Sequence, residues 1–384
     1  MSGLRRALQI SHRPAAGLAA LGAFWGAYAA WLPAVKARAG FEDATMGMVM
    51  LGAAVGNIAA MAVYPALARR LGPRMLPLTA LALSLAALAQ LAGAGGPVAL
   101  FAAFAVMGVA MASIDVACNV RISVLEAQYG VPLMNLGHGL YSLAFAVSAA
   151  LAGVARAAGA PQAVVVGVIM LLLLGVAAHM RGDGVAGPRE SAALAPTPMP
   201  WAAVLPAALI LMAAFMSENA TETWSALHIE RTLGGQPGEG AFGPAMMGLM
   251  MAIGRLSGQA VAARLGEARL VAISTVIAMA GAMMLAAAPS REIAVAGVAL
   301  IGIGVAVVVP SANSLLGRRV APQDRPRAIS RAFMLGFTGF FIGPVAMGWV
   351  SQGGGLRLGF AAVTGVMALI LLGLWALLRR PVLA

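Results

Sequence analysis

Long apolar stretches alternate with short polar segments along nearly the whole chain. Each stretch holds about 20 residues, the length that an α-helix needs to cross the hydrocarbon core of a bilayer. The stretches are continuous and do not alternate every second residue, which excludes a membrane β-barrel. We therefore expect an all-α integral membrane protein with twelve transmembrane helices, at residues 14–35, 44–67, 75–94, 97–121, 133–156, 161–179, 201–226, 241–264, 269–288, 291–316, 328–351 and 356–378.

The charges in the polar segments support this layout. Of the 25 basic residues, 18 fall on the side of the two termini, 6 fall on the opposite side and Arg255 lies within a span. Because loops rich in Lys and Arg stay on the cytoplasmic side, we expect a multi-pass protein of the cell inner (cytoplasmic) membrane with both termini cytoplasmic. The first apolar stretch is of full length and is interpreted as a retained helix, not a signal peptide.

Composition narrows the class of protein. Apolar residues make up 61% of the chain and charged residues only 10%, with a mean hydropathy of +0.91. Soluble domains carry about 25% charged residues, so a soluble enzyme, a disordered chain and a coiled coil are excluded. The net charge of +12 comes from arginines between apolar runs, which favours a role in topology and not nucleic-acid binding.

The sequence also lacks the motifs of several kinds of chemistry. Cys118 is the single cysteine, so no disulfide framework and no cysteine-based metal site can form within one chain. There is no clustered His and Asp set for a metal, and no Gly-Lys-Ser/Thr loop that would cradle phosphate. We therefore expect no metal, no cofactor and no enzymatic activity.

The two halves of the sequence repeat each other weakly. Asn119 corresponds to Asn313 at an offset of 194 residues, and Gly153 to Gly348 at an offset of 195. A stretch rich in Pro, Gly and Ala lies between the halves and predicts a flexible tether. Because each half holds six spans, the halves are expected to be parallel repeats around a central cavity. The expected domains are an N-terminal six-helix half at 1–180, a cytoplasmic linker at 181–200 and a C-terminal six-helix half at 201–384.

The loop LARRLGPR at 67–74, between the second and third spans, has a degenerate second copy, AARLGEAR, at 262–269. With these loops, the six-plus-six layout and the central linker, the chain resembles the major facilitator superfamily over essentially its whole length. The stretches DVACNVRISVLEAQYG and SENATETWSALHI also resemble a poorly characterised, sugar-transporter-like branch of it. The resemblance implies transport by alternating access. It also implies a gating loop, although Arg69 replaces the usual acidic residue; the loop residues concerned are Arg69, Arg70, Gly72 and Arg74.

Ionisable side chains within the spans are the candidates for a site. Each costs about 2.5–3.5 kcal/mol to insert, and such residues normally face a cavity. Glu218 and Glu222 lie four residues apart on one face of the seventh span, and Arg255 in the eighth span is a potential partner. Close carboxylates can share a proton, but a structural ion pair, or an early helix end that leaves Glu222 among the headgroups, also fits.

Further polar and aromatic residues accompany these charges. Asp115 and Asn119 lie on one face of the fourth span and form either a binding pair or interhelical glue. His138 begins a face of the fifth span that also holds Tyr141 and Ser142, and it is either a proton relay or a solvated structural residue. The remaining candidates are Asn57, Asn313, Trp25 and Tyr28, the two aromatic residues being cavity walls or core.

These features together predict a secondary active transporter that moves a small polar solute by alternating access. We expect proton symport, with the solute, protons and the lipid bilayer as partners, no nucleic acid, and a monomer. One alternative is a proton-coupled efflux antiporter of small amphipathic compounds, and another is a polytopic receptor that does not transport. The sequence leaves the identity of the solute open.

Overall fold

The computed structural model describes residues 2–92, 95–182 and 199–382, and these form helices joined by short turns. Most of the expected linker, at 183–198, lies outside the described residues. The α-helices are α1 (Ser2–Ala39), α2 (Asp43–Leu71), α3 (Met75–Ala86), α4 (Gly96–Tyr129), α5 (Met134–Ala157), α6 (Gln162–His179), α7 (Trp201–Leu227), α8 (Phe242–Leu265), α9 (Glu267–Ala287), α10 (Arg291–Val305), α11 (Val308–Gly317), α12 (Arg325–Gly336) and α13 (Gly339–Leu378).

Within the described residues, nine stretches are long and apolar enough to cross a membrane. Two of these stretches each contain two spans. The chain turns at Gly72, with φ of 50°, between α2 and α3, and at Gly355, with φ of 75°, inside α13. After Gly355 the chain packs back on itself, since Gly359 lies against Met347. Together with α8, the helices agree with the twelve expected spans and confirm the all-α membrane fold.

Three helix boundaries differ from the simple expectation. α1 begins at Ser2, well before the expected start of the first span, and so extends beyond the apolar stretch. α4 continues past Arg121 to Tyr129, because no helix breaker precedes Gly130. The tenth span is divided into α10 and α11 at Ala306–Val307, just before Pro310, which cannot donate a helical hydrogen bond.

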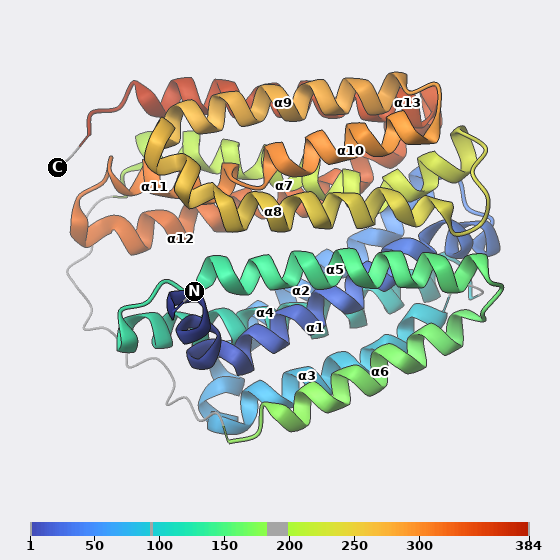
Figure 1. Cartoon of the computed structure of the whole chain (residues 1–384), viewed down its shortest axis with the longest axis horizontal. Helices are drawn as coiled ribbons and strands as arrows, with labels where there is room; N and C mark the ends of the chain where they lie inside the picture. Colours follow the sequence, from blue (N-terminus) through green and yellow to red (C-terminus); the bar gives the residue numbers. More distant parts are fainter. Residues whose placement is uncertain (1, 93–94, 183–198, 383–384) are drawn as a thin grey trace.

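The helices form two bundles (Figure 1), with α1–α6 in the first bundle and α7–α13 in the second. In the first bundle α1 packs against α5 and α2 against α4, and in the second α7 packs against α13 and α9 against α10. The bundles meet along α5 with α8, and along α2 with α13. Both termini lie at one end, here called the terminal end; the opposite end is called the far end.

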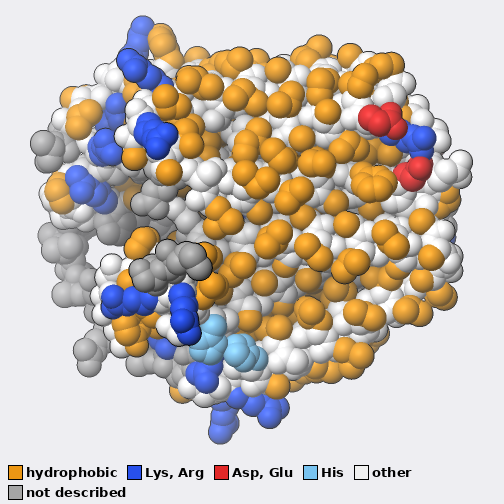
Figure 2. All heavy atoms as spheres, viewed as in Figure 1, with side chains coloured by type: hydrophobic (Ala, Val, Ile, Leu, Met, Phe, Trp, Pro, Cys, Tyr) orange, Lys and Arg blue, Asp and Glu red, His pale blue; other side chains and the backbone are white. Residues whose placement is uncertain are grey.

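The surface separates into an apolar belt and two charged ends. Figure 2 shows hydrophobic side chains over the middle of the molecule, with Lys and Arg gathered at the terminal end and a small acidic and basic group at the far end. Large side chains such as Val168 and Leu171 of α6 are more than half exposed. Such a belt is typical of a surface that faces lipid, because exposed apolar side chains are unfavourable in water and are accommodated by the hydrocarbon of the bilayer.

Close packing of α1 on α5 depends on glycine. A β-carbon at Gly22 would clash with the carbonyl oxygen of Tyr141, and one at Gly26 with that of Phe145. Small residues allow helix backbones to approach in this way in membranes, where van der Waals contact replaces the hydrophobic driving force. This close approach fixes the height and rotation of α5 and therefore of the polar side chains that it carries.

Replacing Gly26 with alanine is expected to lower stability by about 1–3 kcal/mol, because α1 and α5 must separate to admit one methyl group. The matched control is Gly167→Ala in α6, where a β-carbon meets nothing within 4 Å. That change is expected to be neutral or slightly stabilising. Thermal unfolding of the two purified variants in detergent measures the difference. Equal melting temperatures would contradict the proposed packing constraint.

Candidate functional site

Two carboxylates one helical turn apart lie in the interior of α7. The helix runs unbroken to Leu227, so the alternative in which the seventh span ends before Glu222 is wrong. The side chains of Glu218 and Glu222 are both buried, with exposed fractions of 6% and 4%. Glu222 is therefore buried within the protein, on an unbroken helix.

Arg255 of α8 connects both bundles. Its Nη2 donates to Oε1 of Glu218 at 3.0 Å, and its Nη1 donates to the hydroxyl of Ser142 on α5 at 2.6 Å. Gly254 and Gly258 on either side of it let α8 approach Ala306, Ile303 and Val307 of the neighbouring segment closely. The pairing of Arg255 with Glu218 agrees with the partner expected from the sequence. The hydrogen bond to Ser142, which ties the second bundle to the first, was not predicted.

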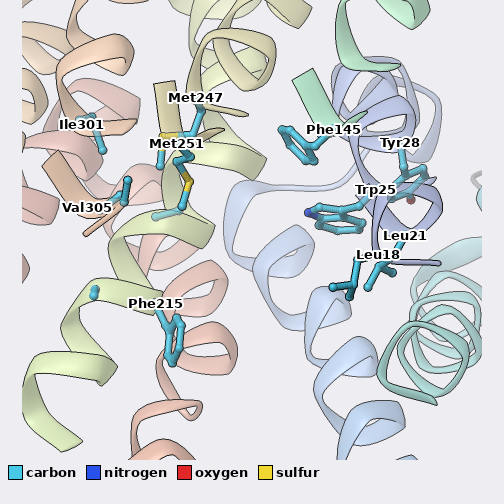
Figure 3. Close-up of a cluster of buried hydrophobic side chains, with 14 of the residues drawn as sticks. Leu18, Leu21, Trp25, Tyr28, Phe145, Phe215, Met247, Met251, Ile301 and Val305 are labelled. Carbon is cyan, nitrogen blue, oxygen red and sulfur yellow. The ribbon is translucent and has the colours of Figure 1, made fainter. Parts of the chain in front are cut away.

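Trp25 of α1 reaches the second carboxylate. Its indole hydrogen-bonds Glu222, so that this contact also crosses between the bundles. In Figure 3 the ring projects from α1 toward the helices of the second bundle, with its nitrogen on the side facing them. Tyr28, one turn further along α1, lies 5.8 Å from the Trp25 ring between centroids and packs edge-on against Phe104. Trp25 therefore lies beside Glu222, and Tyr28 packs between Trp25 and Phe104 of α4.

Asp115 and Asn119 form a pair on α4, as their spacing predicts. The amide nitrogen of Asn119 donates to Oδ1 of Asp115 at 3.0 Å, while its own amide oxygen is buried without a partner. The amide oxygen of Asn313 on α11, its counterpart in the repeat, is also buried without a partner. The two repeat-related amides thus share one feature: an unused acceptor in the interior.

Two residues of α5 complete the group. Tyr141 lies within electrostatic range of Glu218, Glu222, Arg255 and Asp115, and His138 lies within electrostatic range of Arg255. The sequence placed Tyr141 and Ser142 on one face with His138 but named no partner for them. The structure provides these partners: Ser142 binds Arg255, and Tyr141 lies near the charges of α7 and α8 in the other bundle. The central cluster, as named below, comprises Trp25, Asp115, Tyr141, Ser142, Glu218, Glu222 and Arg255.

Within the described residues, the remaining predicted residues form no hydrogen bond or ion pair with this cluster. Asn57 on α2 is partly exposed and makes no hydrogen bond with any residue that the structure describes. The side chains of Arg69, Arg70 and Arg74 are exposed at the terminal end, around the turn at Gly72. None of the three arginines forms an ion pair within the described part of the chain, so the gating role remains a prediction.

Ion pairs join the two bundles at the far end. Arg231 binds Asp43 at the start of α2 through both carboxylate oxygens, at 2.5 and 2.7 Å, and Lys36 adds a third contact to Asp43 at 2.9 Å. Arg156 at the end of α5 binds Glu230 bidentately, at 2.5 and 2.8 Å. From the sequence these residues were counted only as loop charges, since nothing in their spacing reveals a partner in the other half.

A further ion pair at the far end lies wholly within the second bundle. Glu239 pairs with Arg291 and accepts a hydrogen bond from the backbone N–H of Gln236 at 2.6 Å. The backbone hydrogen bond, followed by Arg291, holds the pKa of Glu239 below its ordinary value. This pair makes no bridge between bundles and so provides a control for those that do.

No group of three or more metal-ligating His, Cys, Asp or Glu side chains gathers within residues 2–92, 95–182 and 199–382. Within those ranges, Cys118 is buried and lies in no disulfide. The central cluster offers carboxylates, one guanidinium, a serine hydroxyl and aromatic rings.

Comparison with known proteins places the chain in a family. The model of the Major Facilitator Superfamily matches residues 207–384. The chain is 30% identical over 370 residues to an uncharacterised MFS-type transporter of Yersinia pestis, covering 95% of this chain and 93% of that protein. It is 25% identical over 335 residues to membrane protein MosC of Rhizobium meliloti, covering 86% of this chain and 81% of that protein.

Solved structures share the fold at low sequence identity. A mutant of the nucleoside transporter NupG superposes with a TM-score of 0.74 at 14% identity, over 96% of this chain and 100% of that one. A bacterial homologue of the lysosomal transporter Spinster superposes with a TM-score of 0.73 at 14% identity, over 98% of this chain and 99% of that one. The full-length relatedness and the shared fold agree with the two-bundle architecture: the chain belongs to the Major Facilitator Superfamily and is a membrane transporter.

Proposed function

We propose that this transporter moves a small polar solute across the cytoplasmic membrane by alternating access, driven by proton symport. The observation that carries the proposal is that Arg255 makes two contacts. It hydrogen-bonds Glu218 in its own bundle and Ser142 in the other bundle. A proton that binds Glu218 removes the negative charge opposite Arg255 and so changes how strongly the two bundles are held together. Proton binding and bundle movement are thereby coupled at one side chain.

The far-end ion pairs support a state closed at that end. Asp43–Arg231 and Arg156–Glu230 both link the bundles there and must break for the far end to open. Large apolar side chains of α2 and α8 are exposed, among them Ile58, Met61 and Leu256. In the proposed cycle this is the state open toward the terminal end, and breaking the far-end pairs begins the opposite state.

The concentration of Lys and Arg at the terminal end supports its assignment to the cytoplasmic side (Figure 2), because positively charged loops are retained there. In that orientation the solute enters from outside through the far end and leaves at the terminal end. The cluster that binds it lies between the two bundles, as is general for carriers built from two such repeats.

Glu218→Gln is expected to abolish proton-driven accumulation while sparing solute exchange, because the amide stays neutral and mimics the protonated carboxyl. The solute is first identified by the rise in melting temperature that it gives the purified wild-type protein. Uptake is then measured in proteoliposomes with and without a pH gradient. Glu239→Gln is the control and is expected to accumulate solute as the wild type does. Accumulation at the wild-type level in Glu218→Gln vesicles would refute the coupling role.

Weakening the far-end pairs is expected to expose the interior from that end. Met50 lines a hollow there together with Leu32, Lys36, Met46, Trp224 and Leu227. In a Cys118→Ser background, maleimide labelling of Met50→Cys should accelerate roughly fivefold in Asp43→Asn or Arg231→Gln, as expected for a partly exposed pair contributing about 1 kcal/mol. Glu239→Gln, which breaks a pair inside one bundle, should leave the rate unchanged. Identical labelling rates in all variants would show that the far-end ion pairs do not hold that end closed.

A further inference from the structure

The central cluster carries more negative than positive groups. It holds three carboxylates, on Asp115, Glu218 and Glu222, against the single guanidinium of Arg255. Arg255 lies 3.0 Å from Glu218, so its positive charge is paired with one of the three carboxylates. Within the part of the chain that the structure describes, neither Asp115 nor Glu222 forms an ion pair. Asp115 accepts a hydrogen bond from Asn119, and Glu222 hydrogen-bonds Trp25 and lies within electrostatic range of Arg255 and Glu218. Buried Glu222 and half-buried Asp115 therefore make no ion pair with Arg255, whose guanidinium is paired with Glu218.

Buried amide groups in the described part of the chain show a similar excess of acceptors. The amide oxygens of Asn119, Asn219 and Asn313 are all buried without a partner. These atoms can only accept hydrogen bonds. Unsatisfied acceptors in an apolar interior are costly, and a ligand with hydrogen-bond donors would satisfy that of Asn119, whose amide nitrogen binds Asp115 of the cluster. This imbalance is independent of the carboxylates, because amide oxygens carry no net charge, yet it favours the same kind of ligand.

The surroundings of Glu222 suit an ammonium group in particular. The carboxylate lies beside the indole of Trp25, and Tyr28 packs against that indole. Aromatic faces attract organic cations through the ring quadrupole, and the attraction grows when water is excluded. The hydroxyl of Tyr28 is fully buried without a partner. A carboxylate beside an aromatic ring is chemistry that recognises an amine.

An anionic solute would meet the opposite conditions. It would have to displace Glu218 from Arg255 and would then lie among three carboxylates, where like charges repel strongly at low dielectric. We propose that the transported solute is a small polar organic cation, an amine carrying further hydrogen-bond donors, whose ammonium group binds Glu222 beside Trp25. This substrate class rests on the proposed function, since it treats the central cluster as the transport site.

The electrostatic part of the proposal can be tested before any solute is known. A cysteine at Tyr141, in a Cys118→Ser background, is reacted with the cationic reagent 2-(trimethylammonium)ethyl methanethiosulfonate and with the anionic reagent 2-sulfonatoethyl methanethiosulfonate. Each rate is divided by that for a free thiol. The cationic reagent is expected to be favoured by about three- to tenfold for each unpaired carboxylate nearby. A second cysteine at His138, on the same helix face, repeats the measurement should the first variant fail to fold.

The role of Glu222 is tested in the same assay. Glu222→Gln is expected to lower the preference for the cationic reagent several-fold, whereas Glu239→Gln, outside the cluster, should leave it unchanged. A ratio near one, a preference for the anionic reagent, or a ratio unaffected by Glu222→Gln would overturn the proposal. A ratio near one is also the outcome expected if Glu222 and Asp115 hold protons and the site takes a neutral solute.

Matched compounds then test recognition itself. The probes are glucosamine, glucose and glucuronate, and ethanolamine, ethylene glycol and glycolate, so that each amine has a neutral and an acidic counterpart. The amines are expected to give the larger rise in melting temperature, and Glu222→Gln to remove it. A larger rise in melting temperature with a neutral or acidic compound than with the matching amine would overturn the proposal. If no probe raises the melting temperature, the ratio of the reaction rates of the cationic and anionic reagents decides whether the proposal stands.

The two proposals fail in different ways. Were the protein not a proton-coupled carrier, proteoliposomes would show no proton-driven uptake, yet the cationic preference at Tyr141→Cys would persist. Were the substrate class wrong, uptake would remain and the preference would vanish.

Discussion

The position of Arg255, whose side chain is only 18% exposed between two apolar bundles, is the constraint on which the rest of the site depends. A guanidinium cannot lose its proton and is expensive to remove from water, so it must be held by a carboxylate and by hydrogen bonds. Glu218 supplies the charge and Ser142 the second acceptor. Because Glu218 lies in the same bundle and Ser142 in the other, the cost of burying one cation is met by groups on both sides of the moving boundary.

That arrangement makes packing and chemistry interdependent. Ser142 reaches Arg255 only because α5 lies tightly on α1, where Gly22 and Gly26 replace larger residues. The same contact brings α1 into place, so that Trp25 meets Glu222. A shift of α5 relative to α8 therefore changes the hydrogen bonds of the charged groups in the central cluster. A transporter needs such a link, since movement of the bundles must alter the affinity of the site for its solute and its coupling ion.

Much of the fold could be predicted from the sequence, because span length and apolar composition are set by bilayer thickness alone. The stripe of Glu218 and Glu222 was equally accessible, since residues four apart share a helix face. The partners Ser142 and Trp25 were not, because they belong to other helices whose rotation is decided by glycine packing. The ion pair of Asp43 with Arg231 was missed for the same reason: its residues are 188 positions apart and look like ordinary loop charges.

The dependence of the site on one buried ion pair is tested most directly by a double-mutant cycle on thermal stability. Arg255→Gln, Glu218→Gln and the double variant are compared with the wild type in detergent at one pH. A buried pair predicts that Arg255→Gln alone, which leaves Glu218 without its counter-charge, costs more than the double change, so that the two effects are strongly non-additive. Losses in melting temperature that simply add in the double variant would contradict the account.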